Sequence, residues 1–411
     1  MYYFFGAGSN CYGALKFFGK ENVKAIVDNN EAKFGTTLCG VPIISVDELV
    51  ARIQDEMVII TAFLASREII NQLEENGIMN YYVCPFMQSG FYDCDTMIDE
   101  WELTEYESFA VYDANPISEL ILKKVQEKKG KACRIVELTE EEWRQGVEGV
   151  AEILLVIKDG IEESDFVRFS GYQQVISLFA EMNKKRTRDY KHLQQYRDLH
   201  KGERCVLVGN GPSLCAQDLD RICQSGVVSI GCNQIQKIFE DTKWRPKYCV
   251  IGDGLVYERN KGLWRDDMTY FLRKFVDDSE VGDNVILYSG KAQQYYPGYP
   301  HFSDDLVQGV YGGRSVMYDM LQIAVYLGFK EIYLIGVDFS WGEDGKGTHF
   351  CEGYVDSGII RAALGYKEEQ RHAYISAKRF AEEHGIKIYN ATRGGYLDVF
   401  ERVDFDEIFG E

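Results

Sequence analysis

The chain has 411 residues, of which 45% are hydrophobic, and its formal net charge at pH 7 is -20. This length predicts roughly two or three globular domains, and the negative charge disfavours nucleic acid or an anionic membrane surface as the main partner, because both would be repelled. The eleven cysteines form no CxxC pair, and the sequence shows neither a signal peptide nor an apolar run of about 18 residues, so we expect a cytoplasmic protein without a transmembrane segment.

The first residues predict a βαβ unit. An apolar strand at Tyr2–Phe5 runs into the glycine-containing turn 6–10, and a second strand at Val23–Val27 ends at Asp28. An acidic residue about twenty positions after the glycines holds a ribose in dinucleotide-binding folds. The glycine spacing is GxGxxxxG instead of GxGxxG, so a structural or regulatory module and a ligand-binding module both remain open.

Residues 28–49, DNNEAKFGTTLCGVPIISVDEL, resemble the small Rossmann-like modules of nucleotide-sugar acyltransferases and polysaccharide-biosynthesis proteins. The chain continues to alternate strand-like and helix-like segments through residues 91–170, which we interpret as a connector and a second α/β segment. Residues 171–200 are polar and lack proline, with no glycine after Gly171, so they predict one long linking helix. His192 and His200 are expected on the solvated face of that helix.

The stretch 204–214, RCVLVGNGPSL, is the strongest candidate for a nucleotide-binding turn. Its apolar strand stops at a turn formed by Gly209, Asn210, Gly211, Pro212 and Ser213, and a helix is predicted from Ala216. Glycines let backbone N–H groups approach an anion, and the following helix N-terminus favours negative charge. A purely structural turn, with Ser213 as the N-cap of the helix, is the alternative.

Polar residues follow three further predicted strands. Carboxyl ends of parallel strands line the ligand crevice of such a sheet, so we predict that these residues contact the nucleotide, although capping and turn formation would also explain them. They are Asn233 and Gln234 after strand 227–230, Asp253 after strand 248–251, and Asp338 after strand 331–335.

Arg314 and Ser315 immediately precede an apolar helix predicted at Val316–Leu327. A cation and a hydroxyl beside a helix N-terminus suit a phosphate, whereas a surface arginine near a helix start is the simpler interpretation of Arg314. The polar loop 342–349, GEDGKGTH, brings His349 to the same edge.

Four elements occur in order: VGNGPSL, GCNQ, a strand ending in GDG, and GGRS followed by LGFKEIYLIGVDF. Over roughly residues 195–400 they resemble the bacterial 6-hydroxymethylpterin diphosphokinase MptE-like domain, and they are similar to bacterial sialyltransferases that use CMP-activated sialic acid. The resemblance implies that the NGPS turn and Asn233 contact the nucleotide.

Two positions depart from the sialyltransferase pattern. Ser340 and Trp341 stand where that family has tyrosines, and residues 366–369 lack its catalytic histidine. The THx pattern of motility-associated glycosyltransferases with the same domain suggests His349 as the replacement base, with His372 as the weaker candidate.

The sequence therefore predicts an α/β protein in which a Rossmann-like parallel-sheet nucleotide-binding domain occupies residues 201–411. A small Rossmann-like module at 1–90, the connector and second α/β segment at 91–170, and the linking helix at 171–200 precede it.

We expect a glycosyltransferase of cell-surface polysaccharide or glycan biosynthesis. It would take a nucleotide-activated sugar, with CMP as the expected nucleotide, and a glycan acceptor. Arg314 would stabilise the leaving phosphate and His349 would act as general base. No metal or other cofactor is expected. The alternatives are ATP-dependent diphosphoryl transfer, in which Asp253 and Asp338 would bind magnesium, and a nucleotide-binding protein without catalysis.

Overall fold

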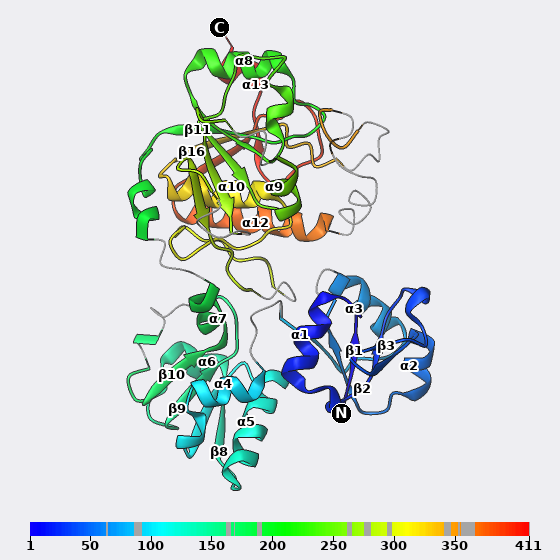
Figure 1. Ribbon diagram of the computed structural model, residues 1–411. Coiled ribbons are helices and arrows are strands. Elements are labelled where there is room, and N and C mark those ends of the chain that lie inside the picture. Colours follow the sequence, from blue (N-terminus) through cyan, green and yellow to red (C-terminus); the bar gives the residue numbers. More distant parts are fainter. Residues whose placement is uncertain are drawn as a thin grey trace. The chain divides into compact units, whose positions relative to one another are not determined.

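The computed structural model describes residues 1–410 except 63–64, 86–92, 162–165, 168, 187–190, 261–264, 275–280, 294–297, 341–346, 352–353 and 355–365. Trp341 and the first part of the GEDGKGTH loop therefore lie outside the described residues. The chain divides into two compact units (Figure 1): unit 1 is Met1–Lys185 with Ala292–Gly298, and unit 2 is Arg186–Lys291 with Tyr299–Glu411. In the described parts of the chain, no helix combines the length and the apolarity needed to cross a bilayer.

Unit 1 contains a six-stranded sheet of order β3-β4-β2-β1-β5-β6. All neighbouring strands are parallel except β3 and β4. The strands are β1 (Tyr2–Phe5), β2 (Val23–Val27), β3 (Thr37–Leu38), β4 (Val41–Ile44), β5 (Met57–Ile60) and β6 (Tyr81–Val83), and the helices between them are α1 (Ser9–Phe18), α2 (Val46–Arg52) and α3 (Ser66–Glu75). The predicted βαβ opening is therefore confirmed.

A four-stranded parallel sheet of order β10-β9-β7-β8 completes unit 1. Its strands are β7 (Ser108–Tyr112), β8 (Arg134–Leu138), β9 (Ile153–Val156) and β10 (Gln174–Ser177), and its helices are α4 (Cys94–Glu100), α5 (Pro116–Lys129), α6 (Glu140–Gln145) and α7 (Leu178–Arg186).

The long helix predicted for residues 171–200 is wrong. That segment contains β10, α7 and a 3-10 helix at Lys191–Tyr196. Val175 and Ile176 are β-branched and favour a strand, and Ile176 is buried. The strand therefore takes residues 174–177, and helix begins only at Leu178. His200 does not lie on a solvated helix face either, since only 5% of it is exposed.

Unit 2 contains an eight-stranded sheet of order β15-β14-β13-β12-β11-β16-β17-β18, in which every neighbouring pair is parallel. The strands are β11 (Arg204–Val208), β12 (Val228–Cys232), β13 (Tyr248–Ile251), β14 (Thr269–Arg273), β15 (Val285–Tyr288), β16 (Glu331–Ile335), β17 (Lys387–Asn390) and β18 (Glu401–Arg402). This confirms the predicted Rossmann-like parallel sheet.

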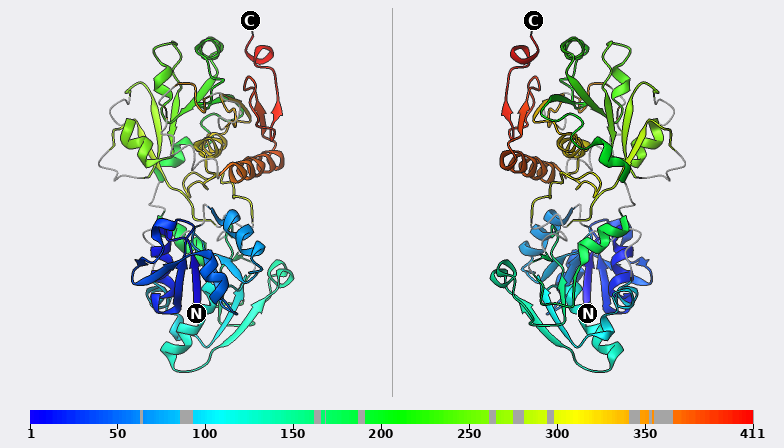
Figure 2. Two further views of the ribbon diagram at one scale, coloured as in Figure 1. Left: turned by 90° about the vertical axis from the view of Figure 1, so that its right-hand side faces the viewer. Right: turned by 90° about the vertical axis from the view of Figure 1, so that its left-hand side faces the viewer.

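The helices of unit 2 are α8 (Ala216–Ser225), α9 (Gly254–Asn260), α10 (Val316–Tyr326), α12 (Lys367–Glu383) and α13 (Phe405–Phe409). Helix α10 packs against β11, β12 and β13, and α12 lies beside α10 (Figure 2). Side chains on both faces of β11 are buried, from Cys205 through Val208, which is why the strand is a continuous apolar run.

The order of the strands indicates where a ligand would bind to the sheet of unit 2. The chain runs from β11 outward to β15 on one side, and then returns to place β16 on the other side of β11. In open parallel sheets, ligands bind beyond the carboxyl ends of the strands at such a reversal. The turns that follow β11 and β16 therefore form the candidate site.

Candidate functional site

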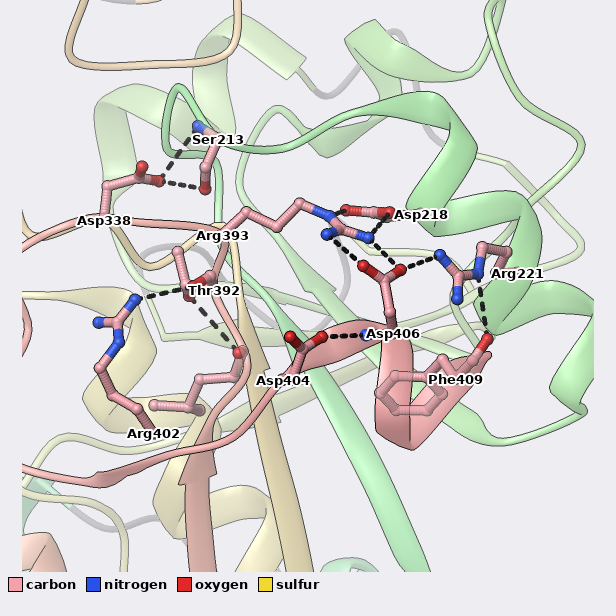
Figure 3. Close-up of polar contacts among 11 residues, drawn as sticks. Ser213, Asp218, Arg221, Asp338, Thr392, Arg393, Arg402, Asp404, Asp406 and Phe409 are labelled. Carbon is pink, nitrogen blue, oxygen red and sulfur yellow. Dashed lines mark hydrogen bonds and ion pairs between the residues drawn. The ribbon is translucent and has the colours of Figure 1, made fainter. Parts of the chain in front are cut away.

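The NGPS turn after β11 is bonded to the turn after β16. The Gly209 N–H donates to Ile335 O and the Gly211 N–H donates to Gly336 O, both at 2.8 Å. The Ser213 hydroxyl donates to Asp338 Oδ2 at 2.8 Å and its N–H donates to the same oxygen at 3.3 Å (Figure 3). These three N–H groups, which the sequence suggests for a phosphate, are thus engaged within the protein.

The glycines of this turn are required because its backbone lies very close to the backbone of the turn after β16. A Cβ atom on Gly211 would lie 2.0 Å from Asp338 Oδ2 and 2.7 Å from Gly336 O, and one on Gly209 would lie 2.4 Å from Gly336 O. The predicted N-cap role of Ser213 is wrong, because α8 begins later and its N-cap is Cys215. The turn is therefore a junction between two strands of the sheet.

Gly211→Val is expected to destabilise unit 2. Its side chain would push against Asp338 and the Gly336 carbonyl, and overpacking of this kind costs about 1–3 kcal/mol or more. Urea denaturation followed by circular dichroism measures the loss. Gly347→Val is the control, since its Cβ would meet only His349 O at 3.5 Å. A Gly211→Val chain as stable as this control would contradict the interpretation.

Tyr354 lies at the carboxyl ends of β11 and β12. Its hydroxyl oxygen accepts hydrogen bonds from Asn210 Nδ2 at 2.7 Å and from the Gln234 N–H at 3.2 Å. Gln234 Nε2 also donates to Tyr354 O at 3.1 Å. Burial raises the pKa of Tyr354 well above its ordinary value, so the hydroxyl is neutral. Tyr354 belongs to a polar segment without periodicity, and nothing in the sequence pattern singled it out.

Two buried amide oxygens lie at the ends of β11 and β12. Asn210 Oδ1 and Asn233 Oδ1 accept no hydrogen bond in the part of the chain that the structure describes. The amide orientation of Asn210 is determined, because its Nδ2 donates to the carbonyl oxygen of Cys232 at 3.0 Å. Asn233 has a left-handed backbone with φ 49°. Buried acceptors are normally satisfied, so both oxygens call for a donor that the described residues do not supply.

The two acids of the magnesium alternative are far apart. β12 and β11 lie between β13, which precedes Asp253, and β16, which precedes Asp338. At about 4.8 Å per strand their backbones are about 14 Å apart, too far for both carboxylates to reach one ion with bonds of about 2.1 Å. Asp253 Oδ1 accepts the Val256 N–H at 3.1 Å. Among the described residues, no group of three or more His, Cys, Asp or Glu side chains is placed to hold a metal.

Arg314 and Ser315 lie at the start of α10, as predicted. Ser315 caps the helix by accepting the Met317 N–H at 3.2 Å, which is the role a serine plays without a ligand. Arg314 has a left-handed backbone with φ 61°. Its carbonyl accepts Gln370 Nε2 at 2.9 Å, and its guanidinium lies 5.4 Å from the centroid of the Tyr366 ring. Arg314 is thus held between the starts of α10 and α12.

His349 reaches the same edge through Tyr354. The two rings are stacked, with centroids 4.1 Å apart and an interplanar angle of 10°, and the Phe350 N–H donates to Asn210 O at 3.0 Å. Burial, and secondly the charge of Lys237, lower the pKa of His349 to about 4. The imidazole is therefore neutral near pH 7 and can accept a proton.

The other histidines with a predicted role lie elsewhere. His200 lies near the amino ends of the strands, where its ring nitrogens are 3.0 Å from Glu203 Oε2 and from Tyr248 Oη. His372 lies in α12, with its ring centroid 4.4 Å from that of Tyr299. His192 is exposed. In contrast to these three histidines, His349 is joined by the described contacts to the NGPS turn.

A buried polar network that sequence reasoning missed joins β14, β15 and α10. Asp319 accepts Arg273 Nη2 at 2.8 Å, Arg273 Nε at 3.1 Å and the Tyr288 hydroxyl at 2.6 Å. Burial raises the pKa of Asp319, and the Arg273 charge opposes that shift. The available signal was the acid itself, since Asp319 interrupts the apolar helix VMYDMLQIAVY.

A second charged cluster holds the last helix to α8 (Figure 3). Arg393 donates to Asp218 Oδ2 at 2.8 Å and to Asp406 Oδ2 at 2.9 Å. Arg221 also pairs with Asp406, and its Nε donates to Phe409 O at 3.0 Å. Next to it, Thr392 Oγ1 accepts the Val337 N–H at 3.1 Å. The cluster thus fixes the helix that follows the NGPS turn.

Comparison with known proteins confirms the predicted resemblance to the MptE-like domain. Residues 177–344 match the family model described as 6-hydroxymethylpterin diphosphokinase MptE-like. The solved structure of a MAf glycosyltransferase from Magnetospirillum magneticum AMB-1 aligns with 72% of this chain at 15% identity and a TM-score of 0.34. The match spans 51% of that protein, about half its length. No curated protein matches the sequence.

Proposed function

We propose that this chain is a glycosyltransferase that takes its sugar from a nucleotide-activated donor and transfers it to a glycan acceptor. The observation that carries the proposal is the pair of buried acceptors, Asn210 Oδ1 and Asn233 Oδ1, at the ends of two neighbouring strands. The edge where the strand order reverses is where such a sheet binds nucleotides, and the MptE-like match over residues 177–344 supports a transferase.

The two amide oxygens favour a base that carries an amino group. Cytosine presents its N4 amino donor and adenine its N6 amino donor, whereas the corresponding O4 of a uracil-type base is itself an acceptor. An acceptor facing another acceptor leaves both without a partner and costs about 1–3 kcal/mol. A cytidine or an adenosine nucleotide therefore fits this pair of oxygens better than a uridine nucleotide does, and the CMP-linked donor expected from the sequence is one of the two.

In the proposed reaction, the acceptor hydroxyl forms a bond to the anomeric carbon while the bond from that carbon to the phosphate oxygen breaks. The nucleotide leaves with the electron pair. Arg314, beside the N-terminus of α10, would stabilise the negative charge that develops on the phosphate. The neutral imidazole of His349 would take the proton of the hydroxyl. The NGPS turn, Gln234 and Tyr354 would shape the nucleotide site, with Ser315, Asp253 and Asp338 holding the surrounding turns.

Asn233→Gly is expected to weaken CMP binding by about tenfold, because it leaves a buried donor of the ligand without its partner. Glycine adopts the left-handed backbone of this position without strain. Isothermal titration with CMP in the absence of metal measures the change. The matched control is Asp198→Gly, at an exposed position that also has a left-handed backbone, with φ 58°. Equal CMP affinity in both variants would contradict the assignment.

A thermal-shift screen of CMP, CDP, UDP, GDP and ATP, each with and without magnesium, separates this proposal from its alternatives. CMP binding without metal supports it. The name of the matched family points to diphosphoryl transfer as the second candidate, and ATP binding that requires magnesium would support that reaction instead. CMP binding without transfer from any CMP-linked sugar would indicate a non-catalytic nucleotide-binding protein.

A further inference from the structure

Unit 1 has its own reversal of strand order. The chain runs from β1 to β2 and β4 on one side, and then crosses to β5 and β6 on the other. Residues 6–10 follow β1, and Thr61 follows β5. The carboxyl ends of β1 and β5 therefore border the position at which an open parallel sheet accepts a ligand.

Helix α1 begins at this position with features that suit an anion. It has ten residues, its N-cap is Gly8, no side chain caps it, and its first turn holds no acidic residue. Gly8 and Ser9 are exposed. The first N–H groups of a helix carry partial positive charge and bind phosphate well. Lys33 adds a cation nearby, with Nζ 3.3 Å from Ala7 O.

Asn10 supplies an independent sign of a ligand. Only 7% of this residue is exposed, and its Oδ1 is buried without a hydrogen-bond partner in the described parts of the chain. Its Nδ2 donates to Thr61 O at 3.3 Å, which determines the amide orientation. The side chain thus joins the first turn of α1 to the end of β5, the two elements that border the reversal of strand order.

Asp28, the acid after β2, holds the turn in place. Its Oδ2 accepts the Ala7 N–H at 2.8 Å and Lys33 Nζ at 2.8 Å, and its Oδ1 accepts the Asn30 N–H at 2.9 Å. These contacts fix the backbone that leads into α1 and keep Lys33 beside it. The carboxylate therefore positions the start of α1 and the Lys33 ammonium group, which are the two groups that would face an anion.

We propose that unit 1 carries a second nucleotide site at this edge. The phosphate binds at Gly8 and Ser9 near Lys33, and a hydroxyl or N–H donor of the nucleoside bonds Asn10 Oδ1. An unpartnered acceptor attracts a donor and repels a bare phosphate, so the ligand is a phosphorylated nucleoside and not inorganic phosphate alone. This site is separate from the nucleotide edge of unit 2.

Gly8→Asp tests the site with little risk to the fold. A Cβ on Gly8 meets no atom within 4 Å, and aspartate at an N-cap position stabilises a helix. The added charge repels a phosphate, so binding should weaken by about tenfold or more, as for the loss of hydrogen bonds to a charged group. Met79→Asp is the matched control, since this exposed residue precedes β6 and lies at the opposite edge of the same sheet.

The measurement is isothermal titration of the full chain with ADP, UDP, CMP and inorganic phosphate, made in the Asn233→Gly background, in which the affinity of unit 2 for CMP is already weakened. At least one nucleotide should bind, lose affinity with Gly8→Asp and with Asn10→Leu, and keep it with Met79→Asp. The proposal is overturned if no nucleotide binds, if Gly8→Asp changes none of the isotherms, or if phosphate binds as well as every nucleotide and Asn10→Leu leaves all affinities unchanged.

Discussion

Asp319→Ala is expected to lower the free energy of unfolding by about 3–5 kcal/mol, the cost of removing one partner from a buried ion pair. Only 4% of the Asp319 side chain is exposed, and its carboxylate accepts hydrogen bonds from Arg273 and from the Tyr288 hydroxyl. The substitution would leave the Arg273 guanidinium and that hydroxyl without their acceptor. Urea denaturation at neutral pH measures the effect.

The matched control for this prediction is Asp398→Ala. Asp398 pairs with both Arg371 Nε and Nη2, at 3.2 and 3.0 Å, with nearly the same geometry as the buried pair. Its side chain is 63% exposed, so solvent screens the interaction and the expected loss is about 0–1 kcal/mol. If the two variants lost equal stability, the buried network would be no stronger than a surface pair.

The position of this network links stability to the proposed reaction. Arg273 and Tyr288 are the last residues of β14 and β15, and Asp319 lies in the first turn of α10. The network therefore fixes the N-terminus of α10, which directly follows Arg314 and Ser315. A preorganised helix N-terminus stabilises charge without rearranging during the reaction.

His349→Ala is expected to lower kcat for sugar transfer by about a hundredfold or more, the contribution of a positioned general base, with little change in CMP affinity. The pH profile should also be distinctive. Because protonation removes the base, and because the pKa of His349 is lowered to about 4, the acidic limb of kcat/KM should lie near pH 4 instead of near 6.5. Initial rates of the wild-type chain across this range test it.

The control for this prediction is His372→Ala, in α12, which should retain near-full turnover. Transfer that survives in His349→Ala but fails in His372→Ala would move the base to α12. An acidic limb near pH 6.5 in the wild-type profile would likewise contradict His349 as the base.

Much of unit 2 was predictable because burial on both faces of a parallel sheet leaves a plain signal. Apolar runs such as β11 and β16, each followed by glycine and polar residues, indicated the strands and the edge where the candidate site lies. Asn233 and Asp338 were expected there because strand ends of a parallel sheet share one edge. The structure places them at that edge.

The contact partner of each turn residue was not predictable from the sequence. A glycine permits a close approach but does not show what approaches, and Gly209 and Gly211 face the turn after β16. Ser213 bonds Asp338, 125 residues away, which no local pattern encodes. The contacts of Tyr354 with Asn210 and of Asp319 with Arg273 likewise join residues far apart in the sequence. Residues 174–177 formed a strand because β9 offered an edge.

The strand order of unit 2 also dictates when its candidate site can form during synthesis. Strand β11 is the first strand of unit 2 to be made, but it needs β16 on one flank, and the N–H groups of Gly209, Gly211 and Ser213 find their acceptors at Ile335, Gly336 and Asp338. The ion pairs that hold helix α8 form later still, because they need Arg393 and Asp406. Contacts so distant in sequence form slowly and expose apolar strands meanwhile. During synthesis, unit 2 therefore depends on late residues to bury its first strand, β11.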